Sequence, residues 1–169
     1  MTPNEALLLL RSLNAPEKLL LHVALVSEAG ELLLRGLSKR QLALDVDWVR
    51  CGILLHDAGK ILHPEELSQK GAQHEPAGEL LLLSHRVPPH IARGCLSHAQ
   101  WQTMTCALEE LLVALADKLW KGARVPELEL RVIDAIAAKL NQERWDLFLE
   151  LDALFEKIAS GSEDRLMRS

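Results

Sequence analysis

The sequence is poor in aromatic residues: Phe, Trp and Tyr together make up 4% of its 169 residues, and tyrosine is absent. It also lacks runs in which β-branched and polar residues alternate, the pattern of a half-buried strand. The apolar fraction is nevertheless 49%, and it comes from leucine and alanine, which are both favourable in helices. We therefore expect an all-α fold, in one domain large enough to bury a core.

Cysteines are few. Cys51, Cys95 and Cys106 form no CxxC pair and are odd in number, which argues against a disulfide framework and favours a reduced compartment. The leucine runs at 7–10 and 80–83 are each broken by charge well before the roughly 18 consecutive apolar residues that a membrane span needs. No basic segment precedes the first leucines, so we expect no signal peptide and a cytoplasmic location.

The chain has no excess of positive charge. Its net charge is −5 and its isoelectric point is about 5.8, which disfavours binding to a nucleic-acid backbone. We therefore expect neither nucleic acid nor a membrane as a partner.

Capping residues and prolines mark the helix starts. Thr2-Pro3-Asn4-Glu5 is a capping box with proline at the first helical position, and Asn14, Asp45 and Pro88 mark later starts. The last helix is expected to bury Trp145 and to stop at Gly161. We predict one domain over residues 1–161 and a flexible polar tail over residues 162–169. The predicted helices span about 3–13, 17–37, 45–57, 75–85, 89–98, 108–122, 126–141 and 145–160.

An adjacent His-Asp pair ends the third predicted helix. His56 and Asp57 follow an apolar run, and Gly59 is expected to stop the helix. A carboxylate in the last turn faces the negative end of the helix dipole, which is unfavourable unless a cation lies beside it. Adjacent side chains diverge by about 100° on a helix, so both can bind one ion only if the helix is distorted or if two ions are present.

Further histidines and an aspartate are expected to face the core. His22 shares a helix face with apolar residues, and His98 follows Ile91 and Cys95 on another. Each alone can be a hydrogen-bonded core residue, an ion-pair partner or a surface residue. Together they need many buried partners, and one or two ions of Mn, Fe, Co, Ni or Zn would satisfy them. The predicted metal ligands are His22, His56, Asp57, His74, His98 and Asp117.

The order His22 … His56-Asp57 … Asp117 resembles the HD-domain superfamily of metal-dependent phosphohydrolases. Leu54–Lys60 looks like the family's LLHDxGK string, and Ala114–Leu119 looks like its ALADKL segment. His74 and His98 are similar in position to two extra histidines of dinuclear members. The stretch from His74 to Lys118 also resembles bacterial enzymes that cleave diadenosine tetraphosphate symmetrically, whereas the Gly-Tyr-Pro signature of the cyclic-di-GMP branch is absent.

The resemblance implies a helical bundle with the metal site in its core. His22, His56, Asp57 and Asp117 would bind a first ion, and His74 and His98 would join a bridging Asp57 around a second. The implied reaction is hydrolysis of a phosphate ester or anhydride, of a nucleotide or dinucleotide, by a metal-activated water.

Catalytic roles would fall to Asp57 and to Lys60, which would also bind a substrate phosphate. Lys118 and Lys121 would bind further phosphates, although positive charge at a helix end explains both without a substrate. Two other functions remain open: a di-iron oxygenase of the same superfamily, and a non-catalytic nucleotide-binding domain.

Overall fold

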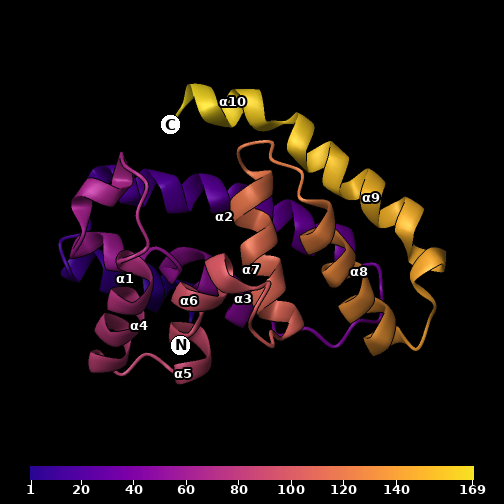
Figure 1. Cartoon of the computed structure of the whole chain (residues 1–169), viewed down its shortest axis with the longest axis horizontal. Helices are drawn as coiled ribbons and strands as arrows, with labels where there is room; N and C mark the ends of the chain where they lie inside the picture. Colours follow the sequence, from indigo (N-terminus) through magenta and orange to yellow (C-terminus); the bar gives the residue numbers. More distant parts are fainter.

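The computed structural model describes all 169 residues and contains helices but no strand, so the all-α prediction is confirmed. Figure 1 shows the arrangement of the helices. None of them is both long enough and apolar enough to cross a membrane. The elements are α1 (Pro3–Ser12), α2 (Glu17–Leu37), α3 (Val46–Leu55), the 3-10 helices η1 (Ala58–Ile61) and η2 (Pro64–Leu67), α4 (His74–Ser84), α5 (Pro89–Ala92), α6 (Gly94–Gln100), α7 (Leu108–Leu119), α8 (Pro126–Leu140), α9 (Arg144–Ser160) and α10 (Ser162–Met167).

Helix α7 lies at the centre of the bundle, where it contacts α2, α3, α6, α8 and α9 (Figure 1). Nearly every residue from Leu108 to Leu119 is buried, as expected from a helix that is apolar on almost all sides. α9 and α10, drawn in yellow tones, run along the outer edge of the molecule (Figure 1). The central helix therefore carries Asp117 into the interior.

Helix α3 is packed on two sides. Val49 and Ile53 belong to a large apolar cluster with α2, α7, α8 and α9, whereas Cys51 and Leu55 belong to a smaller cluster with α1, α4 and α5. Burying a side chain of this size contributes about 1.5–3 kcal/mol. The C-terminal end of α3, where the His-Asp pair follows, is thus held by both clusters.

Capping residues and prolines predicted most helix starts correctly. Thr2 and Glu5 form the expected capping box, and the Asp45 side chain accepts a hydrogen bond from the backbone N–H of Trp48. Asn141 ends α8 in the left-handed conformation, at φ 52° and ψ 48°. The predicted single helix from Pro89 to His98 is two short helices, α5 and α6, which still bury Ile91, Cys95 and His98 on one side.

The C-terminal residues differ from the expectation of a flexible tail. Residues 162–167 form α10, and Arg165 is only 4% exposed. Its guanidinium donates hydrogen bonds to the carbonyl oxygens of Trp120 (2.8 Å), Leu119 (3.2 Å) and Ile158 (2.5 Å). One buried cation therefore ties α10 to the ends of α7 and α9. The domain boundary at residue 161 itself stays a prediction.

Trp145 is not buried as expected. It is 68% exposed, and Leu147 takes the inward position at the start of α9, in register with Leu151 and Phe155 four and eight residues later. The four-residue spacing of these side chains is the inward stripe of the helix. Trp145 lies off that stripe, beside the guanidinium of Arg144.

Candidate metal centre

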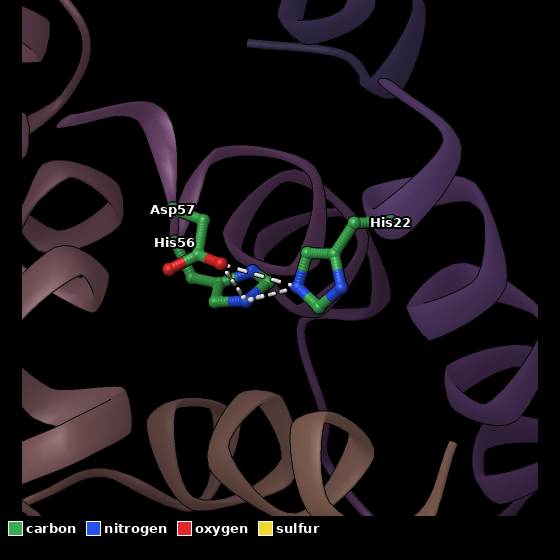
Figure 2. Close-up of side chains that lie close together, drawn as sticks. All are labelled: His22, His56 and Asp57. Carbon is green, nitrogen blue, oxygen red and sulfur yellow. Dashed lines mark hydrogen bonds and ion pairs between the residues drawn. The ribbon is translucent and has the colours of Figure 1, made fainter. Parts of the chain in front are cut away.

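The helical backbone conformation ends between His56, the cap of α3, and Asp57. His56 keeps helical dihedral angles as the C-terminal cap of α3, whereas Asp57 turns out of the helix at φ −104° and ψ 15°. This is the local distortion that two adjacent residues need if they are to face one point. Both side chains are buried, and Figure 2 shows them pointing toward His22 from α2.

Gly59 does not stop the helix as predicted, because α3 has already ended at Leu55. Gly59 lies in the 3-10 helix η1 and is buried against α4. A Cβ at this position would lie 1.8 Å from the carbonyl oxygen of His74 and 2.6 Å from the backbone nitrogen of Gly78. The missing side chain therefore lets α4 approach the His-Asp pair.

One group of possible ligand atoms lies around Asp57 Oδ2. His22 Nε2 is 3.1 Å from this oxygen and 3.4 Å from His56 Nε2, and His56 Nε2 is 3.6 Å from the oxygen. Figure 2 shows the three side chains converging from α2 and from the end of α3. Their ligand atoms lie within 4.8 Å of one another, close enough to hold one metal ion.

A second group lies around the other oxygen of Asp57. His74 Nε2 is 3.2 Å from Asp57 Oδ1, and His98 Nε2 is 3.7 Å from it. These atoms also lie within 4.8 Å of one another. Asp57 is therefore common to both groups and turns one carboxylate oxygen toward each.

Asp117 lies at the edge of the first group of possible ligand atoms but belongs to neither group. Its Oδ1 is 3.8 Å from His22 Nε2 and 3.7 Å from His56 Nε2. Its Oδ2 accepts a hydrogen bond from Lys118 Nζ at 2.7 Å. The structure thus brings five of the six predicted ligands into close groups and places the sixth beside the first group.

Hydrogen bonds orient three of the four imidazoles. His56 Nδ1 lies 2.7 Å from the carbonyl oxygen of Ile53, and His98 Nδ1 lies 3.0 Å from that of Gly94. A carbonyl oxygen only accepts, so each Nδ1 is the donor and each neutral ring keeps its lone pair on Nε2. His74 Nδ1 is held by the carboxylate of Glu66. In each case Nε2 is the atom that faces Asp57.

The charges of the site keep both carboxylates ionised. Burial lowers the pKa of His56, but the charges of Asp57 and Asp117 outweigh it and raise that pKa, so a proton on this ring competes with a metal ion. Burial raises the pKa of Asp57, but the charge of His56 and hydrogen bonds from His22 and His74 outweigh it and hold that pKa well below its usual range. Burial likewise raises the pKa of Asp117, and the hydrogen bond and charge of His56 lower it overall. Burial and the charge of His56 lower the pKa of His98 to about 4. Ionised carboxylates beside a neutral imidazole fit a divalent metal.

A cavity of about 320 Å³ opens beside the first group. Lys60 lies between the cavity and the first group of ligand atoms. Its Nζ is 2.6 Å from Asp57 Oδ2, and its side chain also lines the cavity. Lys118 pairs with Asp117, Lys121 is exposed, and neither lines this cavity. The lining residues are Lys18, Leu21, His22, Lys60, Leu67, Trp120 and Ser169.

Two residues near the site were not predicted from the sequence. Lys18 lines the cavity and lies one helical turn before His22, a spacing that places both on one side of α2 and could have indicated it. Glu66 contacts His74 from the 3-10 helix η2, a single turn that is too short for a periodic pattern to mark it. Residues of such short turns that reach a site through tertiary contacts leave no such signal.

A family model described as HD domain matches residues 19–122. This range contains every predicted metal ligand. No curated protein and no solved structure matches the chain.

Proposed function

This chain belongs to the HD domain family, and on that premise we propose that it is a metal-dependent phosphohydrolase that cleaves a phosphate ester or anhydride of a nucleotide or dinucleotide. One observation carries the proposal: Asp57 turns one carboxylate oxygen toward His22 and His56 and the other toward His74 and His98. A carboxylate shared in this way, among imidazoles whose Nε2 atoms face it, is the donor set of a transition-metal centre.

His22, His56 and Asp57 would hold one divalent ion, with Asp117 beside them, and Asp57, His74 and His98 would hold a second. When bound, such ions lower the pKa of coordinated water and offset charge that develops on the phosphoryl oxygens. The absence of thiolate ligands favours Mn, Fe, Co, Ni or Zn.

The residues of the cavity would bind and orient the substrate. Lys60 is the catalytic lysine of this proposal, because its ammonium group lies between Asp57 and the cavity and can hold the phosphoryl group as a point charge. Lys18 adds a second positive charge to the same cavity. Leu21, Leu67 and Trp120 add apolar surface suited to the base or sugar of a nucleotide. Lys118 and Lys121 would then act on the substrate only from outside this cavity.

The test is phosphate release from a panel of nucleotides, dinucleotides and simple phosphate esters by metal-stripped protein reconstituted with Mn²⁺. We expect release by the wild type, and we expect Asp57→Ala to lose both metal and turnover while its circular dichroism stays helical. Asp47→Ala, at an exposed position in the first turn of α3, is the matched control and should behave as the wild type.

The other functions give different results in the same experiment. Two irons per chain in the protein as purified, together with no phosphate release after reconstitution, would indicate the oxygenase instead. Nucleotide binding without metal or turnover would indicate a binding domain. Metal retained by Asp57→Ala would contradict the proposed ligand set.

A further inference from the structure

His74 differs from the other buried histidines in how its ring can be oriented. His56 and His98 each donate from Nδ1 to a carbonyl oxygen three or four residues earlier in their own helix. His74 is the first residue of α4, so the residues three and four positions before it lie outside that helix. No carbonyl of its own helix is available to orient the ring, and the acceptor must come from elsewhere in the fold.

Glu66 supplies that acceptor. Its Oε2 accepts hydrogen bonds from His74 Nδ1 and from the His74 backbone N–H, the latter at 3.2 Å. Its Oε1 accepts from the backbone N–H of Gln73 at 3.1 Å. The Glu66 side chain is only 6% exposed, although it comes from the loop-like 3-10 helix η2. One carboxylate thus holds both the start of α4 and the ring of its first residue.

The loop is shaped to keep the Glu66 carboxylate in this position. Gly71 passes so close that a Cβ there would lie 2.2 Å from Glu66 Oε1 and 2.3 Å from its Cδ. A side chain at position 71 would push the Glu66 carboxylate out of the place from which it contacts His74. The contact therefore depends on two positions of a loop that carries none of the predicted metal ligands.

We propose that Glu66 is a positioning residue for the ion held by Asp57, His74 and His98. By accepting the hydrogen bond of His74 Nδ1–H, Glu66 fixes the ring so that Nε2 is the atom directed at Asp57 Oδ1, 3.2 Å away. Glu66 does not contact the other group, so its effect is confined to one of the two sites. The inference rests on the metal centre of the proposed function and not on the reaction catalysed there.

The experiment is titration of Mn²⁺ into the metal-free full-length protein by calorimetry. Loss of a carboxylate that orients a ligating histidine costs about 10- to 100-fold in metal affinity. We expect Glu66→Ala to weaken one class of Mn²⁺ sites by this factor and to leave the other class unchanged. Glu66→Gln, whose amide oxygen can still accept from Nδ1–H, should retain most of the affinity. Glu65→Ala, on the same turn with a 53% exposed side chain, is the matched control.

A second comparison separates positioning from a general effect on the loop. In a His74→Ala background, Glu66→Ala should cause no further loss of Mn²⁺ affinity, because the ring that it orients is gone. If Glu66→Ala does not fold, Glu66→Asp, which keeps the charge but is one methylene shorter, takes its place.

Three results would overturn the proposal: equal weakening of both classes of sites, the same loss of affinity with and without His74, or Mn²⁺ binding by Glu66→Ala that matches Glu65→Ala. Failure of the proposed function is a separate result. A wild type that binds Mn²⁺ in two classes of sites but releases no phosphate would contradict the hydrolase and leave the role of Glu66 testable by the same titrations.

Discussion

Gly59→Ala is predicted to damage the metal centre from a position that carries no ligand. The added Cβ would lie 1.8 Å from the carbonyl oxygen of His74, and real Cβ atoms essentially never come closer than 3.0 Å to such an atom. The neighbouring atoms at Gly59 are backbone, so no flexible side chain can rotate away. The start of α4 must therefore retreat by about 1.2 Å, the difference between those two distances.

That movement acts directly on a ligand. His74 Nε2 lies 3.2 Å from Asp57 Oδ1, and a displacement of about 1 Å at a reacting centre can cost about 100-fold in rate. Overpacking of this kind also costs about 1–3 kcal/mol of unfolding free energy. We expect Gly59→Ala to lower the melting temperature, to lose the Mn²⁺ site that includes His74, and to reduce phosphate release about 100-fold.

Gly94→Ala is the matched control, because a Cβ at Gly94 in α6 has no atom within 4 Å. Alanine there should be neutral or should stabilise the protein by about 0.5–1 kcal/mol, since glycine is unfavourable inside a helix. If Gly59→Ala binds Mn²⁺ and melts as Gly94→Ala does, the close approach of α4 does not hold the site, and the reasoning is refuted.

Three further outcomes are expected. Lys60→Ala should keep its metal but lose about 100-fold in kcat/KM for a phosphate substrate, as measured by steady-state kinetics beside elemental analysis. Arg165→Ala, which leaves the buried carbonyl oxygens of Trp120 and Ile158 without a donor, should cost about 2–4 kcal/mol in urea unfolding, whereas Arg168→Ala, at an exposed ion pair, should cost less than about 1 kcal/mol. The hydrogen bond from Arg50 lowers the pKa of Glu31 below its ordinary 4.5, so this pair stabilises the fold above that pH and the effect is lost as the pH falls. Arg50→Met should therefore destabilise the protein by less than about 1 kcal/mol at pH 7 and by nothing at pH 2.

Helices were predictable from the sequence because their signals are local. The capping box at Thr2, the cap at Asp45 and the left-handed residue Asn141 each act within one helical turn, and the elements beside them have the expected bounds within one or two residues. The inward direction of His22 and His98 followed from the helical period in the same way.

What the sequence could not predict depends on contacts between distant segments. Gly59 looked like a helix stop, but its role is set by α4, which packs against it. Arg165 looked like part of a polar tail because its partners are carbonyl oxygens of α7 and α9, which no side-chain pattern marks. Glu66 reaches the site through the folding of the chain around η2, which brings it beside His74.

We propose that Asp57 is shared between two metal ions. Anomalous diffraction from crystals of the Mn²⁺-loaded protein tests it most directly. We expect one ion bound by Asp57 Oδ2 with His22 and His56, and another bound by Asp57 Oδ1 with His74 and His98. Ions bound away from Asp57, or a fully loaded crystal in which Asp57 contacts none, would contradict it.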